Sequence, residues 1–294
     1  MTMKNIIPHL WFDNQAKEAT AFYASLFKDS HVTHVSTISN TPSGDCDIVS
    51  FNLSQQDFMA ISAGPIFTFN PSISFFAVFD TEADIKKVWN ALIDGGKALM
   101  SYDTYPWAQK YGWVQDKYGL SWQLSMSKDQ KPQQPITPLC MFTGAVAGKA
   151  KEAIDMYTSV FPNSSLDMAV TYTTDDADTE GFIKHARFTL NGKQFMAMDS
   201  FYPHGFTFNE AISFIIQCDT QEEIDHYWKA LSAVPEAEHC GWLKDKYGIS
   251  WQVVPTIMNT MMSSGDSKKT TRVTKAFMAM KKFDIDALQK AYEE

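Results

Sequence analysis

Apolar residues recur along the chain with the periodicity of helices or of strands, and the predicted helices and strands follow one another in a fixed order. An apolar stretch typical of a strand, residues 6–12, comes first, and its counterpart lies at residues 136–142. Each stretch is followed by a helix with one apolar stripe, at residues 16–27 and 150–161. The two stripes consist of Ala19, Phe22, Tyr23, Leu26 and Phe27, and of Ala153, Met156, Tyr157, Val160 and Phe161.

The order of elements then starts again within each half. After three strand-like stretches, residues 72–79 predict a new first strand. The helix that follows is expected to begin at "DTEAD", where Thr81 and Asp84 have capping-box spacing, and Thr220 and Glu223 have it in the second half. Three more short strands follow. Each half is therefore predicted to contain two successive units, each consisting of a strand, a helix and three further strands.

The two halves are copies of one another. "GWVQDKYGLSWQL" at 112–124 returns as "GWLKDKYGISWQV" at 241–253, with nine of thirteen positions identical. Other blocks repeat in the same order at offsets of 129 to 139 residues, so insertions and deletions fall between blocks. We therefore predict two domains, residues 1–128 and 136–256. Residues 257–294 are expected to form a linker and C-terminal helices, with Asp284 as the N-cap of the last one.

Composition and charge narrow the classes of function. The chain has 294 residues, 45% of them hydrophobic, which is typical of a folded globular protein. Its 34 acidic and 25 basic residues give a net charge of −9, which disfavours a nucleic-acid partner. No apolar run is long enough to span a membrane, and the first residues form no signal-peptide core, so a cytoplasmic location without membrane attachment is expected. The four cysteines have no metal-binding spacing and are interpreted as buried small side chains.

Four strand-helix-three-strand units in one chain resemble the vicinal oxygen chelate superfamily of glyoxalases, bleomycin-resistance proteins and extradiol dioxygenases. Within it the chain is most similar to the PhnB-like branch, which carries the label 3-demethylubiquinone 3-methyltransferase domain. The resemblance rests on "DNQAKEATAFYASLF" at 13–27, "DKYGLSWQL" at 116–124 and the tail at 271–292. It implies an α+β fold of tandem glyoxalase-like domains. Each would contain two βαβββ units forming an open curved sheet around a cavity, followed by a C-terminal helical extension.

The resemblance also implies where a metal would be bound. Metal-using members carry His and Glu ligands on the first and last strands of each unit. In this chain Gln123 and Gln252 take the Glu positions, and Ser74 and Ser213 take those of His. Neutral amides and hydroxyls hold a dication poorly, so we predict no metal ligands and no firmly bound cofactor. A weakly bound divalent metal is left open.

The remaining candidates come from the first unit of each copy. On the opening strand His9 is a candidate, with Leu139 in its place in the second copy. At the end of the unit the candidates are Ser62 and Asp199. The sequence thus predicts a small-molecule site with a shared set of polar side chains: His9, Ser62, Ser74, Gln123, Ser213 and Gln252.

Trp122 and Gln123 are neighbours in a predicted strand, so they face opposite sides of the sheet. If Gln123 faces a cavity, Trp122 packs against a helix. His185 lies on a strand of the second copy and is a candidate base for proton transfer, alongside Asp199. A structural or surface histidine is the alternative interpretation of His185.

Two functions remain open at this point. One is a protein that binds a small polar or aromatic molecule without catalysis. The other is a metal-dependent enzyme of the glyoxalase or dioxygenase type, in which Asp199, His185 and Gln252 would act. Methyl transfer is not expected, because the chain lacks the alternating strand-helix order and the glycine-rich loop of methyltransferases. A homodimer and an intramolecular pairing of the two domains are both left open.

Overall fold

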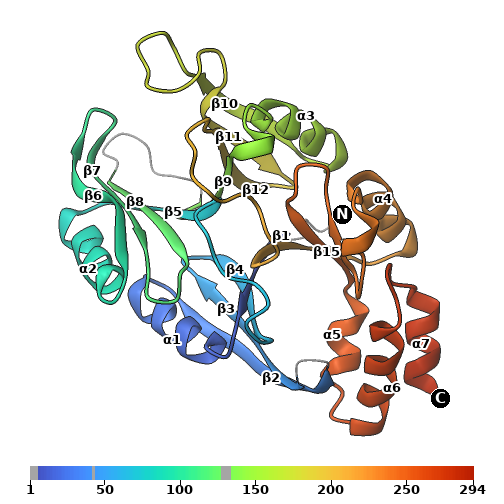
Figure 1. Ribbon diagram of the computed structural model, residues 1–294. Helices are drawn as coiled ribbons and strands as arrows, with labels where there is room; N and C mark the ends of the chain where they lie inside the picture. Colours follow the sequence, from blue (N-terminus) through green and yellow to red (C-terminus); the bar gives the residue numbers. More distant parts are fainter. Residues whose placement is uncertain (1–5, 42–43, 127–133) are drawn as a thin grey trace. The chain divides into compact units, whose positions relative to one another are not determined.

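The computed structural model describes residues 6–41, 44–126 and 134–294, so the predicted end of the first domain at residue 128 lies outside it. The chain divides into two compact parts, residues 7–212 and residues 213–294 with the start of the chain. Its elements are β1 (Ile6–Phe12), α1 (Ala16–Leu26), β2 (His31–Thr41), β3 (Gly44–Leu53), β4 (Gln56–Ser62), β5 (Ile73–Phe79), α2 (Glu82–Ile93), β6 (Lys97–Tyr105), β7 (Ala108–Gln115), β8 (Ser121–Met126), β9 (Ile136–Phe142), the 3-10 turn η1 (Gly144–Val146), α3 (Ala150–Val160), β10 (Ser165–Thr171), β11 (Ile183–Leu190), β12 (Lys193–Asp199), β13 (Ile212–Cys218), α4 (Gln221–Leu231), the 3-10 turn η2 (Pro235–Ala237), β14 (Trp242–Lys244), β15 (Ser250–Pro255), α5 (Ile257–Met262), α6 (Ser267–Met278) and α7 (Ile285–Glu293) (Figure 1).

The predicted βαβββ unit is the building block of the fold, and we call each one a module. In each of the first three modules the first strand pairs in parallel with the last, as β1 does with β4, β5 with β8, and β9 with β12. The two middle strands then follow in antiparallel order. A module therefore covers one face with its helix and leaves its first strand free to pair with another module.

One sheet of the first part combines modules from both copies of the repeat. Its eight strands run in the order β10-β11-β12-β9-β5-β8-β7-β6. The second module of the first copy and the first module of the second copy meet at β5 and β9, which pair antiparallel with Ile73 opposite Cys140. The α+β fold and the duplication are as expected. Which modules share a sheet, however, is decided by this pairing across the repeat boundary.

The fourth module departs from the pattern. Only two strands, β14 and β15, follow α4, and η2 occupies the place of the missing strand. The chain is shorter here, since nine residues lie between Leu231 and Gly241, against nineteen between Leu92 and Gly112. Pro235 begins η2 and has no N–H to donate to a sheet, so this segment forms a turn.

The helix starts follow the sequence signals. The Thr81 hydroxyl accepts from the Asp84 backbone N–H at 3.2 Å. Thr220 and Glu223 form the complete capping box. Asp284 accepts from Ala287 N–H at 2.9 Å and starts α7 as predicted.

The sheets bury their helix-covered faces. Trp122 of β8 is fully buried, and its ring centroid lies 5.2 Å from those of Tyr23 and Phe27, at the inner side of α1 and its C-terminal end. Phe75, opposite Trp122 in β5, completes the contact at 5.5 Å. The prediction that Trp122 packs against a helix is confirmed. Gln123, the next residue, therefore faces the other side of the sheet.

One buried carboxylate, Asp116, connects several residues of the repeated motif by hydrogen bonds. Asp116 accepts hydrogen bonds from Tyr23 Oη at 2.8 Å and Trp122 Nε1 at 3.0 Å, and from the backbone N–H groups of Tyr118 and Leu120. Burial raises the pKa of this carboxyl, and the four hydrogen bonds oppose that rise. Asp116 thus ties the β7–β8 turn to the first helix of the chain.

The second part repeats this arrangement in the fourth module. Asp245 accepts from Trp251 Nε1 at 2.9 Å and from the backbone N–H groups of Tyr247 and Ile249. The C-terminal helices α5, α6 and α7 pack on one another, and the α6–α7 pair is visible at the end of the chain in Figure 1. The Phe283 ring lies against Gly241, where any Cβ would collide with it.

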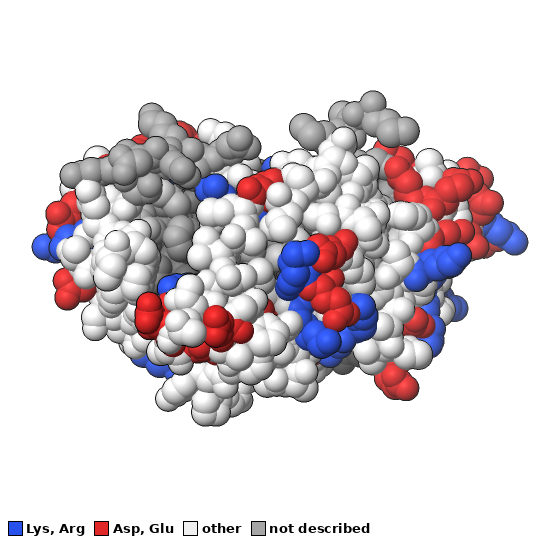
Figure 2. All heavy atoms as spheres, turned by 90° about the horizontal axis from the view of Figure 1, so that it is seen from above, with Lys and Arg blue, Asp and Glu red and all other residues white. Residues whose placement is uncertain are grey.

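Charged side chains of both signs are intermixed on the face that Figure 2 shows. Ion pairs at the surface of the described residues include Lys17 with Asp47 at 2.8 Å. Among the described residues, no helix is long and apolar enough to cross a membrane.

Candidate functional site

The face of the eight-stranded sheet that is turned away from α1, α2 and α3, which we call the helix-free face, carries a buried hydrogen-bonded group around Gln123. The Gln123 amide Nε2 donates to Ser74 Oγ at 2.9 Å, and its Oε1 accepts from Tyr111 Oη at 2.8 Å. All three side chains are buried. Burial raises the pKa of Tyr111 well above its ordinary value, so its hydroxyl remains a donor. These bonds fix the orientation of the amide.

Buried and partly buried apolar side chains surround this polar group. Leu139, Met141 and Met196 form a buried cluster at the centre of the face. Four partly buried side chains pack against it: Phe76, Trp113, Met198 and Phe206. Trp113 stands directly opposite Gln123 in the β7–β8 pair, and its indole Nε1 donates to Ser121 Oγ at 2.7 Å. The face therefore offers aromatic rings and thioethers beside a fixed amide, which is a surface typical of small-molecule sites.

The positions that would hold a metal can now be read from the register. In the second module these positions are Ser74 in β5 and Gln123 in β8. Gln123 stands opposite Phe76, which follows Ser74 by two residues in β5. The matching residues of the third module are Leu139 and Met198, which lies opposite Met141. Two apolar side chains, a hydroxyl and an amide already bonded by Tyr111 do not fit a divalent metal ion. Among the described residues, moreover, no three His, Cys, Asp or Glu side chains gather as a metal would require.

Ser62 and Asp199 lie on the helix side, one residue beyond the positions that share the face of Gln123. Asp199 is buried and accepts from the backbone N–H of Ala150 and Ile183, both at 3.0 Å. Ser62 Oγ accepts from Ala16 N–H at 3.1 Å. Both side chains therefore satisfy the first turn of the helix in their module. Because neighbouring strand residues alternate in direction, a shift of one residue moves a side chain to the opposite face.

His185 lies on the helix-free face and is not brought together with Asp199. In β11 the residue Ala186 pairs with Ala197, which places His185 on the same side as Met198. Burial, reinforced by the positive charge of Arg187, lowers the pKa of His185. Asp199 has its pKa raised by burial, against the hydrogen bonds that it accepts from the backbone. Among the residues that the structure describes, no carboxylate forms an ion pair or hydrogen bond with His185.

His9 and the pair Ser213 and Gln252 lie outside this sheet. His9 is buried in β1, and burial lowers its pKa to about 3. In the fourth module Gln252 Nε2 donates to Ser213 Oγ at 2.9 Å, which repeats the bond between Gln123 and Ser74. The two predicted Gln–Ser pairs thus share one geometry.

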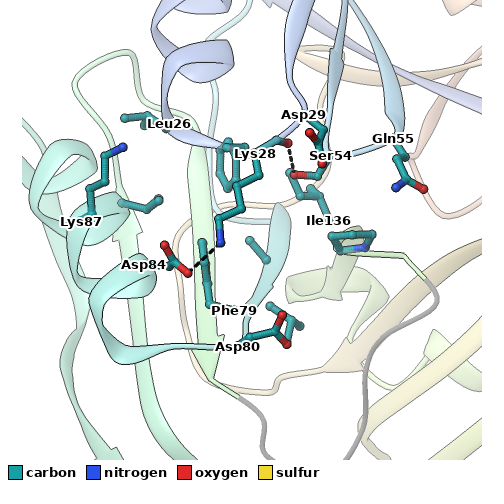
Figure 3. Close-up of a pocket in the computed structure, with 15 residues that line it drawn as sticks. Leu26, Lys28, Asp29, Ser54, Gln55, Phe79, Asp80, Asp84, Lys87 and Ile136 are labelled. Atoms are coloured by element: carbon teal, nitrogen blue, oxygen red, sulfur yellow. Dashed lines mark hydrogen bonds and ion pairs between the residues drawn. The ribbon is translucent and has the colours of Figure 1, made fainter.

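A pocket of about 310 Å³ lies on the helix side of the same part and contains none of the predicted site residues (Figure 3). It is lined by the end of α1, the β3–β4 turn, α2 and the end of β5. Its most prominent polar contact is the ion pair between Lys28 and Asp84 at 3.0 Å, in which each group shifts the pKa of the other toward the charged form. Because these charges satisfy one another at the rim, we take the helix-free face as the better candidate site.

Three residues of the site were not singled out by the sequence. Tyr111 precedes the repeated motif, and the only signal for it is that Cys240 takes its place in the second copy. Trp113 belongs to the motif, but its direction depends on the register of β7. Arg187 stands in a strand without any motif, and only the pairing of β11 with β12 places it on the same face.

Known proteins share the repeat that the two copies form. The family model described as 3-demethylubiquinone-9 3-methyltransferase matches twice, at residues 4–125 and 134–254. The chain belongs to this family. Its duplication, as well as the PhnB-like resemblance inferred from the sequence, is thereby confirmed. No curated protein matches the chain.

Solved structures place the family in a wider fold. A PhnB protein from Bacillus cereus, described as a 3-demethylubiquinone-9 3-methyltransferase, is 36% identical, with 42% of this chain and 100% of that one covered and a TM-score of 0.40. A protein from Staphylococcus aureus is 31% identical, with 44% and 100% covered and a TM-score of 0.19. Glyoxalase I from Zea mays is 12% identical, with 90% and 97% covered and a TM-score of 0.58, which shows a shared fold.

Proposed function

We propose that this chain binds a small molecule with an aromatic or apolar body on the helix-free face of its eight-stranded sheet. The observation that carries the proposal is the fixed Gln123 amide, held by Tyr111 and Ser74 beside the partly buried ring of Trp113. A held amide presents its remaining donor and acceptor positions without losing rotamer freedom on binding. Trp113 and Phe76 supply flat apolar surface next to it.

A further polar atom in the same strand supports the proposal. Gln109 lies in β7, two residues before Tyr111, at a point where the register of β7 against β6 is irregular. Its Oε1 is buried and has no hydrogen-bond partner. Buried acceptors without a partner are uncommon and costly, and a bound polar molecule is one way to satisfy them.

Binding rather than metal-dependent catalysis is the function that these residues favour. The four ligand positions of the sheet carry Ser74, Gln123, Leu139 and Met198, so we derive no metal-assisted step. We also do not assign methyl transfer, which the family description names, because no residue of the face supports that reaction. The four cysteines are free, and three of them are buried, which supports our expectation of a reducing, cytoplasmic environment. The net charge of −9 supports a small-molecule partner over nucleic acid.

The proposal can be tested by titrating neutral aromatic amides and phenols, such as benzamide and phenol, against protein labelled with ¹⁵N. The indole resonance of Trp113, assigned with the Trp113→Phe variant, should shift in a saturable manner. Gln123→Leu should weaken that binding about tenfold or more, since it removes the amide. Gln252→Leu is the matched control and should leave the titration unchanged.

Failure of every such compound to shift the Trp113 resonance would contradict the proposal, as would equal weakening by Gln123→Leu and Gln252→Leu. The spectrum of each bound compound should also stay constant over days. A compound that is consumed by the wild-type protein would show that the site is catalytic.

A further inference from the structure

Arg187 lies on the helix-free face in β11, the second strand from one edge of the sheet. It pairs with Met196 in β12, and Met196 pairs with Leu139 in β9, so all three side chains point to the same side of the sheet. On the other side of Arg187, Met168 of β10 is its cross-strand partner. Three strand spacings, roughly 14 Å along the sheet, separate Arg187 from Ser74. A molecule lying across the partly buried side chains that pack on the Leu139–Met196 cluster can therefore reach toward both residues.

The guanidinium of Arg187 lacks the partner that such a group normally has. Its Nε is buried and forms no hydrogen bond, and none of the described carboxylates forms an ion pair with the side chain. Asp167 of the adjacent strand is engaged elsewhere, accepting from Ser165 Oγ at 2.7 Å and Thr189 Oγ1 at 2.8 Å. Arg187 as a whole is partly buried, but a buried donor such as its Nε loses hydration without compensation when it has no partner.

The surroundings of Arg187 favour an anion. Its cross-strand neighbours are the thioethers of Met168 and Met196, which exclude water and so strengthen electrostatic attraction. His185 lies two residues from Arg187, and burial together with the positive charge of Arg187 lowers its pKa. Near neutral pH His185 is therefore uncharged, with one ring nitrogen that donates and one that accepts. Arginine presents a planar fork of N–H donors that matches the two oxygens of a carboxylate or phosphoryl group.

We propose that Arg187 binds the negatively charged end of the ligand, a carboxylate or phosphoryl group, while the apolar body of that ligand lies over the partly buried side chains that pack on the Leu139–Met196 cluster, toward Gln123. The ligand class is thereby an aromatic or apolar organic anion. This inference rests on the proposed function of the same face. It goes beyond it in naming the charge of the ligand and the residue that recognises it.

The test compares three probes of similar shape: benzoate, phenylphosphonate and the neutral benzamide. Each is titrated while the Trp113 indole resonance is observed. At least one of the two anions should bind the wild-type protein roughly tenfold or more tightly than benzamide, since a hydrogen bond to a charged group is stronger than one between neutral groups. The stronger of the two identifies a carboxylate or a phosphoryl ligand.

Arg187→Met removes the charge and keeps the length and apolar character of the side chain. This variant should lose the preference for the anion while binding benzamide as the wild-type protein does. Arg187→Lys should retain part of the preference, because the charge remains but the planar fork is lost. In the absence of any ligand, Arg187→Met should unfold at the same denaturant concentration as the wild-type protein or at a higher one, since an unsatisfied buried donor is removed.

Two results overturn the inference and leave the proposed function standing: equal binding of the anions and benzamide to the wild-type protein, or an unchanged preference in Arg187→Met. A marked loss of stability in ligand-free Arg187→Met would show instead that the arginine has a structural role. If no probe shifts Trp113, the proposed function itself fails.

Discussion

The two copies of the thirteen-residue motif can be compared bond by bond. In each, the aspartate accepts from the indole Nε1 of the tryptophan six residues later, at 3.0 Å for Asp116 and 2.9 Å for Asp245. In each, the glutamine after that tryptophan donates to a serine of the module's first strand at 2.9 Å. The difference lies just before the motif, where Tyr111 donates to Gln123 and Cys240 stands at the matching position.

This difference separates two roles within one repeated sequence. The aspartate and tryptophan build the turn and the core wherever the motif occurs, so they say little about chemistry. The neighbour of the glutamine differs between the copies, and so does the surface that the glutamine offers to a ligand. A repeat therefore identifies the fold most clearly where it agrees, and the site most clearly where it does not.

The largest expected effect tests the shared part of the motif. Asp116→Ala removes four hydrogen bonds from a buried group and should lower the free energy of unfolding by about 3–5 kcal/mol. Denaturant unfolding followed by far-UV circular dichroism would measure it. The exposed neighbour Lys117→Ala is the control and should leave the midpoint unchanged. A similar small effect for both variants would contradict the assignment of Asp116 as the anchor.

The first strands of the two copies allow a second comparison, since His9 stands where the second copy has Leu139. The pKa of His9 is about 3 in the folded chain, against an ordinary value of 6.5. Between these values the folded state binds fewer protons than the unfolded state. Stability should therefore rise with pH across this window and be lost as the pH falls from about 6.5 toward 3, by at most about 1.4 kcal/mol per pH unit.

His9→Leu should remove this contribution and flatten the acid side of the stability profile, as measured by denaturant unfolding at several pH values. The exposed His31→Gln serves as the control and should retain the slope of the wild-type protein. An unaltered slope in His9→Leu would mean that other groups account for acid sensitivity.

Tyr111→Phe tests the neighbour that only the first motif has. It leaves Gln123 Oε1 without its donor in a buried place, and the expected loss is about 1–2 kcal/mol in the free energy of unfolding. Binding of aromatic probes at Trp113 should weaken as well, because the amide is no longer held in one orientation. A variant with wild-type stability and affinity would show that the hydroxyl has no such role.

The smallest effect is expected from Tyr102→Phe, the same chemical change in the adjacent strand β6. The Tyr102 hydroxyl is buried and has no hydrogen-bond partner, although its ring stacks on Trp89 with centroids 5.6 Å apart. Removing the hydroxyl should therefore leave stability unchanged or raise it by up to about 1 kcal/mol. A loss as large as that of Tyr111→Phe would contradict the distinction between the two tyrosines.

Much of the fold could be predicted from local patterns. Helical stripes, capping residues at Thr81 and Thr220, and the burial of Trp122 each depend on residues close together in sequence. The candidate site was predicted in part. Ser74 and Gln123 are brought together. Asp199 and Ser62 lie one residue further along their strands than the positions on the face of Gln123, so they point to the helix side and accept from the first turn of a helix. A single step in a strand is enough to exchange the two faces of the sheet.

By itself, the sequence determined that the chain is duplicated, that each copy contains two strand-and-helix modules, and that Gln123 and Gln252 hold the same place in the two copies of the motif. These are properties of periodicity and motif, which local interactions enforce. Only the tertiary structure decided that β5 pairs with β9 across the repeat boundary, and that Tyr111, Trp113 and Arg187 share one face with Gln123. The reason is physical: an edge strand can pair with any strand of suitable direction, and that choice depends on contacts far apart in the sequence.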